Sequence, residues 1–282
     1  MEVDADGGAP RGVRRVTHQD AIDARIQSYY AEVFDEHARL TTRSPQGPVE
    51  FLRTQEIVRA RLAPGRVVDI GGGSGIHARA LQRDGFDVQL IDPVPRHVEQ
   101  ARSDGLHAQV ADARALPFPD AVFDGALLLG PLYHLSSRDD RLQALREAAR
   151  VVAPGGFVFA AGLSRYIAFG MASLGRPVPE PYPAEWTALT AHGTPPAGLR
   201  FPAGHFHTAE ELGEEVSAAG LRLLEVVGVE GPAGALLESV ESASAELIEA
   251  SLTVARAAAS VPGIRDMSAH LIAVAQVDAR RV

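Results

Sequence analysis

The stretch VVDIGGGSG, residues 67–75, joins a buried-strand pattern to a glycine-rich turn. Val67, Val68 and Ile70 are apolar and β-branched, which is typical of a central parallel strand covered on both faces. Asp69 lies near the carboxyl end of that strand, where open α/β sheets bind their ligands. The stretch therefore predicts a ligand site at the end of a buried strand.

The spacing of the glycines indicates which ligand is bound. Gly71, Gly73 and Gly75 can adopt positive φ angles and let a ligand approach the backbone at the start of the next helix. A dinucleotide fingerprint would require a small residue where this chain has Ile76. The pattern D-x-G-x-G-x-G instead resembles motif I of the class I S-adenosylmethionine (SAM) dependent methyltransferases. Another Rossmann-like site and a plain tight turn remain the alternatives for this loop taken alone.

A second acidic residue follows at the expected distance. Asp92 closes the apolar strand 88–92, about 20 residues after the first strand, where a carboxylate can accept hydrogen bonds from ribose hydroxyls. The intervening helix, residues 76–84, is ended by Gly85. The alternative is that Asp92 only caps a helix that starts near Pro95.

The third strand repeats the pattern, because HAQVAD, residues 107–112, also ends in an aspartate. The resemblance implies that Asp112 and Ala113 contact the adenine edge, although Asp112 could instead begin a turn. The predicted cofactor-binding residues are Asp69, Gly71, Gly73, Gly75, Asp92, Pro93, Asp112, Ala113, Leu129 and Gly130. The implied cofactor is SAM and the implied product is S-adenosylhomocysteine (SAH).

The resemblance extends over most of the chain and implies an α/β fold. We expect a Rossmann-like seven-stranded sheet, mostly parallel, with helices on both faces and a final antiparallel strand at 269–277. The expected organisation is a disordered tail at 1–18, an N-terminal helical cap at 19–62 and a SAM-binding domain at 63–282. A proline-rich stretch makes residues of about 164–207 a lid insertion.

Local patterns predict individual helices in this frame. Apolar spacing predicts one helix from Asp20 and another at 49–62. Thr208 and Glu211 form a capping-box pattern at the start of a helix. A long Ala- and Glu-rich region, residues 233–259, is expected to be helical.

Composition limits the partners and the chemistry. The net charge of −9 and the lack of a basic stripe argue against a nucleic-acid substrate. The chain has no cysteine, which excludes a thiolate nucleophile, and its ten histidines show no metal-ligand spacing, so no metal is expected. No apolar run of 18 or more residues occurs, so we expect no membrane span and a cytoplasmic protein.

Residues that the cofactor motifs leave unexplained are the candidates for acceptor chemistry. GPLYHL, residues 130–135, places His134 just after the fourth strand, where the methyl group of SAM should point. A histidine is suited to act as a general base near neutral pH, so His134 is the first candidate and His207 the second. The alternatives are that His134 hydrogen-bonds the cofactor or a neighbouring strand, and that His207 is structural.

Aromatic and cationic side chains are the candidates for substrate binding. Tyr30 and Tyr133 could form an aromatic wall or contact the sulfonium, or could belong to the core. Arg39 and Arg165 could bind a carboxylate through paired hydrogen bonds, or could form ordinary ion pairs.

The predicted function is transfer of the SAM methyl group to an oxygen or nitrogen atom of a small molecule by in-line displacement. One alternative is a SAM-binding enzyme of non-methylating chemistry, such as a cyclisation or rearrangement. Another is a non-catalytic SAM-binding regulatory partner, and a nicotinamide dehydrogenase is a weaker third. A homodimer is compatible with the long C-terminal helical region.

Overall fold

The computed structural model describes residues 18–30, 36–173, 184–197, 199 and 201–279. The predicted disordered tail lies outside these residues, apart from residue 18, which begins the first helix. No helix in the described ranges is long and apolar enough to cross a membrane.

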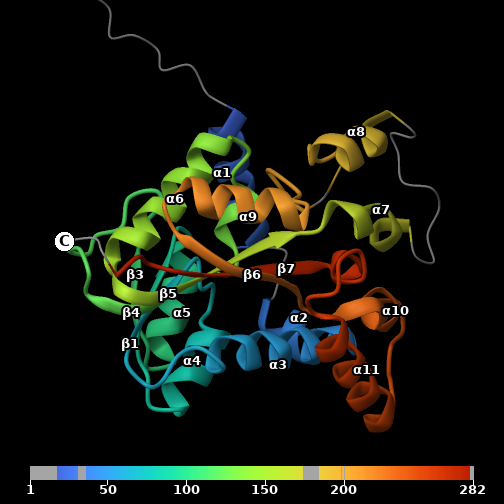
Figure 1. Ribbon diagram of the computed structural model, residues 1–282, viewed down its shortest axis with the longest axis horizontal. Helices are drawn as coiled ribbons and strands as arrows, with labels where there is room; N and C mark the ends of the chain where they lie inside the picture. The colour runs from blue at the N-terminus through green and yellow to red at the C-terminus, as the bar shows by residue number, and fades with distance from the viewer. Residues whose placement is uncertain (1–17, 31–35, 174–183, 198, 200, 280–282) are drawn as a thin grey trace, which may run out of the picture.

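A seven-stranded sheet forms the centre of the molecule, with the strand order β3-β2-β1-β4-β5-β7-β6 (Figure 1). The strands are β1 (Arg66–Ile70), β2 (Asp87–Asp92), β3 (His107–Val110), β4 (Phe123–Leu128), β5 (Val152–Leu163), β6 (Arg222–Gly228) and β7 (His270–Gln276). Neighbouring strands are parallel except β7, which runs antiparallel to β5 and β6. This confirms the predicted sheet, including its antiparallel final strand.

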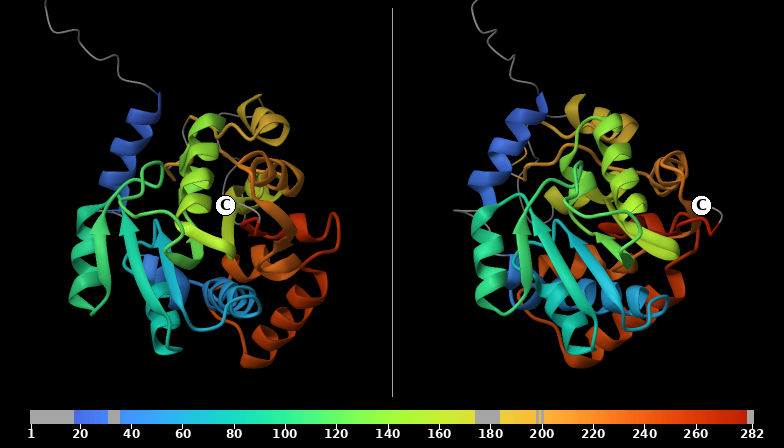
Figure 2. Two further views of the ribbon diagram at one scale, coloured as in Figure 1. Left: turned by 60° about the vertical axis from the view of Figure 1, so that its left-hand side comes forward. Right: turned by 90° about the vertical axis from the view of Figure 1, so that its left-hand side faces the viewer.

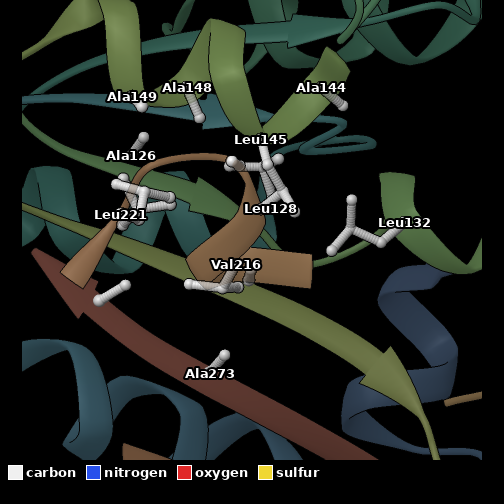
Figure 3. Packing of buried hydrophobic residues seen from close by; sticks show 14 of the residues in the cluster. Ala126, Leu128, Leu132, Ala144, Leu145, Ala148, Ala149, Val216, Leu221 and Ala273 are labelled. Atoms are coloured by element: carbon white, nitrogen blue, oxygen red, sulfur yellow. The ribbon is translucent and has the colours of Figure 1, made fainter. Parts of the chain in front are cut away.

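Helices cover both faces of the sheet (Figures 1 and 2). On one face lie α6 (Arg138–Val151) and α9 (Ala209–Ala218); on the other lie α3 (Gln46–Arg59), α4 (Ile76–Arg83), α5 (Pro95–Ser103) and α11 (Ala245–Ala258). On the first face, Leu145 and Ala148 of α6 and Val216 of α9 pack over Leu128 of β4 (Figure 3). Burying a leucine side chain stabilises a fold by about 1.5–3 kcal/mol, so these contacts hold the carboxyl ends of the strands in place.

Side-chain caps set where the helices of this face begin. Ser137 accepts a hydrogen bond from the Asp140 amide at the start of α6. Thr208 accepts one from the Glu211 amide at 3.1 Å and starts α9, as the capping-box pattern predicts. Each cap satisfies an amide that the helix itself leaves without a partner.

The N-terminal segment and the insertion lie at the carboxyl edge of the parallel strands. α1 (His18–Ser28) and α2 (Glu36–Thr41) precede α3, and the insertion contains α7 (Arg165–Ser173) and α8 (Ala184–His192). Trp186 and Leu189 of α8 pack against Phe206, which returns the chain to α9. This small apolar cluster attaches the insertion to the rest of the fold.

The predicted helical region at 233–259 is interrupted. It consists of the short turn η3 (Gly231–Ala233), α10 (Gly234–Ser239) and α11, with a non-helical link between the two helices. Ser244 accepts a hydrogen bond from the Leu247 amide at 3.2 Å, so it starts a new helix rather than continuing the old one. A serine is more favourable as the N-cap of a new helix than inside a continuous helix, and apolar spacing alone does not reveal this preference.

Candidate functional site

The glycine turn after β1 has the predicted backbone conformation. Gly71, Gly73 and Gly75 have φ angles of 70°, 57° and 89°, in the left-handed region. A Cβ atom on Gly71 would lie 2.8 Å from the Cγ of Pro131, so the turn also packs closely against the segment after β4. Gly75 is the residue before α4, which places the helix start behind the turn.

Asp92 ties the glycine turn to the next strand. Its Oδ2 accepts a hydrogen bond from the Gly73 amide at 2.9 Å, and its Oδ1 accepts one from the Val94 amide at 2.9 Å. Nδ1 of His97 lies 3.1 Å from the same Oδ1. Each carboxylate oxygen can accept a further hydrogen bond, so Asp92 combines the local capping role with capacity for a ligand.

Asp69 carries a buried carboxylate oxygen without a hydrogen-bond partner among the described residues. Its side chain is 1% exposed, and the oxygen is Oδ2. Burial and the nearby charge of Asp92 raise the pKa of Asp69 to about 7. A cationic or hydrogen-bond-donating ligand group would satisfy this oxygen.

Asp112 is held by a neighbouring arginine. Arg114 donates from Nε to Oδ1 at 2.9 Å and from its terminal NH2 group to Oδ2 at 2.6 Å. Burial raises the pKa of Asp112, but the hydrogen bonds and charge of Arg114 outweigh it and hold the pKa below the ordinary value. The same guanidinium lies 3.2 Å from Asp23 of α1, so this contact also links the N-terminal helix to β3.

These residues surround one cavity of about 340 Å³. Of the ten predicted cofactor-binding residues, nine line it: Asp69, Gly71, Gly73, Asp92, Pro93, Asp112, Ala113, Leu129 and Gly130. Gly75 is not in the lining. It faces the protein interior instead, because a Cβ there would lie 2.2 Å from the Cδ1 of Leu106.

The candidate substrate residues divide between the cavity and the insertion. Tyr30, Arg39 and Tyr133 line the cavity. Arg165 does not: it donates to the carbonyls of Phe206 and Ala191 and pairs with Glu211. It therefore attaches the insertion to α9.

The two candidate histidines also differ in position. His134 lines the cavity; its Nδ1 donates to the carbonyl of Pro202 at 2.9 Å, which leaves Nε2 to accept from the hydroxyl of Tyr30 at 3.1 Å. Burial lowers the pKa of His134 to about 4, so it is neutral near pH 7. His207 is fully buried, lies 3.3 Å from Glu215 and is not in the cavity lining.

A buried ionic network, which the sequence does not indicate, forms another wall of the cavity. Nδ1 of His270 lies 2.5 Å from Oε1 of Glu230 and 3.6 Å from Oε2 of Glu50. Arg39 donates to both oxygens of Glu50, and the Gln46 amide donates to both carboxylates. The sequence offers one signal for this network, a histidine at the start of the final strand. In the structure this residue, His270, lies beside the carboxyl end of β5.

Opposite charges balance within this network. Burial lowers the pKa of His270, but the charges of Glu50 and Glu230 outweigh it and raise the pKa to about 9. Burial raises the pKa of Glu50, but Arg39 and His270 outweigh it and lower the pKa to about 2. The described residues include one group that could hold a metal ion: the potential ligand atoms of Glu50, Glu230 and His270 lie within 4.8 Å of one another. Arg39 and the His270 proton already compensate the two carboxylates, so the network does not require a metal ion.

Known proteins resemble this chain over its central part and in its fold. A family model described as "Methyltransferase domain" matches residues 68–160. The "Probable tRNA methyltransferase 9B" of Mus musculus is 36% identical over 109 residues, which cover 38% of this chain and 22% of that protein. The chain therefore spans about a fifth of the length of that relative.

A bacterial relative is matched over more of its length. The "Ubiquinone biosynthesis O-methyltransferase" of Methylocella silvestris is 31% identical over 189 residues, which cover 63% of this chain and 68% of that protein. Among solved structures, a SAM-dependent methyltransferase of Thermotoga maritima, described as a possible histamine N-methyltransferase, superimposes with a TM-score of 0.58. The superposition covers 90% of this chain and 99% of the Thermotoga maritima chain. The two sequences are 21% identical, so this similarity supports the fold alone.

Proposed function

Because the chain belongs to the class I SAM-dependent methyltransferases, EC 2.1.1, we propose that it transfers the SAM methyl group to an oxygen or nitrogen atom of a small molecule. The observation that carries the proposal is one cavity that two sets of residues share. It is lined both by the residues of the cofactor motifs and by a second set that those motifs leave unexplained: Tyr30, Tyr133, His134, Glu50 and His270.

The acidic side chains fit the cofactor by their chemistry. The unpartnered Oδ2 of Asp69 suits the cationic end of SAM, which carries an ammonium and a sulfonium group. Asp92 has the capacity to accept hydrogen bonds from the ribose hydroxyls, and Asp112 with the Ala113 amide suits the adenine edge. The bound cofactor supplies the activated methyl group.

The residues of the chain then have to hold the acceptor in line, exclude water and accept a proton where the acceptor carries one. Tyr133 and His134 lie on η2 (Pro131–His134), directly after β4, and offer aromatic surface to the acceptor. Tyr30 approaches from the N-terminal segment through its hydrogen bond to His134. Such a cover would reduce the access of water to the reacting atoms.

We propose a small molecule rather than tRNA as the methyl acceptor. The net charge of −9 disfavours the binding of a polyanion such as tRNA, and four aspartates, Asp23, Asp69, Asp92 and Asp112, line the cavity. The tRNA methyltransferase relatives are matched over only about a fifth of their length. We propose that the protein acts in the cytoplasm.

The proposal is tested by calorimetric titration with SAM and SAH, followed by detection of SAH in reactions with small molecules and with total tRNA. SAH binding together with turnover of a small molecule supports it. Methylthioadenosine as the product would support non-methylating chemistry. Tight SAH binding without turnover, accompanied by a stable complex with a second protein, would support the regulatory alternative, and absence of SAH binding would refute the proposal.

A further inference from the structure

One end of the cavity lies away from the residues of the cofactor motifs. Asp69, Asp92 and Asp112 lie at or just after the ends of β1, β2 and β3, which are adjacent strands on one side of the sheet. His270 begins β7, which is separated from β1 by β4 and β5. Neighbouring strands lie about 4.8 Å apart, so His270 lies about 14 Å along the sheet from β1 and still lines the same cavity.

The carboxylate of the cofactor itself does not span this distance. The proposed cofactor position puts the adenine at Asp112 and the ribose at Asp92, which places the sulfur near the glycine turn after β1. The carboxylate carbon is four bonds beyond the sulfur, a reach of at most about 6 Å. A hydrogen bond adds about 3 Å. The end of the cavity at His270 is therefore left for a second ligand.

The hydrogen-bond acceptors at this end are already engaged by the protein. Nδ1 of His270 lies 2.5 Å from Oε1 of Glu230, and the His270 backbone amide donates to Oε2 at 3.1 Å. Both oxygens of Glu50 accept from the guanidinium of Arg39. The Gln46 amide also donates to each of the two carboxylates. A ligand group that donates hydrogen bonds would have to compete with these partners.

Two hydrogen-bond donors at this end have no partner among the described residues. Burial lowers the pKa of His270, but the charges of Glu50 and Glu230 raise it to about 9. The ring is therefore an imidazolium near pH 7, and its Nε2 carries a proton with no protein acceptor. The hydroxyl of Thr54, one turn after Glu50 on α3, also has no protein partner, although Thr54 is 4% exposed and lines the cavity. A buried hydroxyl without a hydrogen bond is costly, so both groups favour a ligand that accepts.

The charges around these donors are balanced before a ligand arrives. Arg39 and the imidazolium of His270 offset the charges of Glu50 and Glu230. His77 faces Glu50 from α4 and is neutral near pH 7, because burial lowers its pKa to about 4. One negative charge can therefore be added beside the imidazolium without displacing a partner of the network.

We propose that His270 and Thr54 form a subsite for a carboxylate group carried by the methyl acceptor. The inference rests on the proposed methyl transfer and names a substrate class for the same cavity: small carboxylic acids that are methylated at another oxygen or at a nitrogen atom. A carboxylate only accepts hydrogen bonds and has two oxygens, so it matches two donors that come from β7 and α3. Charge-assisted hydrogen bonds are roughly twice as strong as neutral ones, which favours a carboxylate over an amide or a ketone. Ala161 and Ile272, which are register partners in β5 and β7, line the cavity with apolar surface.

The first test uses acetate as the probe on SAH-saturated protein with ¹⁵N-labelled histidine. The Nε2 signal of His270, assigned by its absence in H270Q, should shift saturably with acetate at constant ionic strength and should not respond to acetamide. T54V replaces the hydroxyl by a methyl group and should weaken acetate binding about tenfold or more. The matched control is T253V, which changes an exposed threonine of α11 outside the cavity lining and should bind acetate like the wild type. No response to acetate, an equal response to acetamide, or an acetate affinity that T54V does not change would overturn the inference.

The second test determines which molecule carries the carboxylate. Calorimetry compares SAH with S-adenosyl-3-thiopropylamine, which is SAH without its carboxylate. The preference for SAH should be the same in the wild type and in T54V. A preference that falls tenfold or more in T54V would assign the subsite to the amino-acid tail of the cofactor and refute the proposal. Failure of the proposed function is distinguishable, because it would appear as absence of SAH binding in the wild type.

The third test compares acids with their amides as acceptors: 4-hydroxybenzoate with 4-hydroxybenzamide, and anthranilate with anthranilamide. In the assay for SAH formation, the acid should have a KM about tenfold or more below that of its amide. T54V should raise the KM of the acid and leave its kcat and the kinetics of the amide unchanged. Better turnover of the amides would contradict the carboxylate subsite. Where neither pair is turned over, the acetate and SAH measurements decide the inference.

Discussion

Substitution of Gly75 by alanine is expected to destabilise the fold through the glycine turn of the proposed cofactor site. The residue has a φ of 89°, so an alanine there takes a left-handed conformation that costs about 1–2 kcal/mol. The new Cβ would also lie 2.2 Å from the Cδ1 of Leu106. Leu106 is 4% exposed and has little room to move, and overpacking of this kind costs about 1–3 kcal/mol. Together these effects predict a loss of about 2–5 kcal/mol.

Gly105→Ala is the matched control. Gly105 has a φ of 84°, but no atom lies within 4 Å of its added Cβ, so only the conformational cost applies. Both substitutions restrict the unfolded chain equally, so that contribution cancels between them. Urea unfolding should therefore place Gly75→Ala about 1–3 kcal/mol below Gly105→Ala. The melting temperatures should differ by about 2–4 °C for each kcal/mol. Equal stability of the two variants would refute the packing argument.

Three further perturbations have defined outcomes. Asp92→Ala removes a charged hydrogen-bond acceptor and should weaken SAH binding about ten- to a hundredfold in calorimetry, corresponding to about 1.5–3 kcal/mol. Glu215→Leu leaves the guanidinium of Arg141 buried without its carboxylate and should cost about 3–5 kcal/mol in urea unfolding, much of which a second change, Arg141→Met, should restore. Desolvation lowers the pKa values of His77 and His134 to about 4, against 6.5 in the unfolded chain, so the unfolded state takes up their protons first and the protein should lose stability as the pH falls from about 6.5 to about 4.

Controls and opposing results separate these effects from general damage. Asp87→Ala changes an exposed position of the same strand, and equal SAH affinity in Asp87→Ala and Asp92→Ala would contradict the ribose role. A double variant at Arg141 and Glu215 as unstable as Glu215→Leu would show that the unpaired charge is not the cause. The acid-induced loss should be smaller in His134→Gln, and an identical pH dependence would exclude His134 as a contributor.

Patterns contained within short segments could be predicted from the sequence. The glycine turn after β1, Asp92 at the end of β2, Asp112 two residues after β3 and the capping residue Thr208 each depend on neighbours a few residues away. The strand order and the antiparallel final strand follow from the family resemblance that those patterns support. The prediction of one continuous helical region at 233–259 is wrong at Ser244, because apolar spacing does not show whether a serine caps a new helix or continues the previous one.

The assignment of titratable residues to the cavity depended on packing. Arg165 and His207 lie in promising segments but pair with Glu211 and Glu215 on α9, outside the cavity lining. Conversely, His270 gives little signal in its own segment. Its significance comes from two distant carboxylates.

The sequence alone determined the strand segments and the glycine turn after β1, because backbone conformation and strand patterning are governed by local residues and a repeating period. Only the tertiary structure decided which ionisable groups share the cavity. Glu50, Glu230 and His270 are separated by up to 220 positions in the chain (270 less 50) and meet because α3 packs beside the ends of β6 and β7. The electrostatic effect of each charge depends on distance and burial, and neither quantity can be read from spacing along the chain.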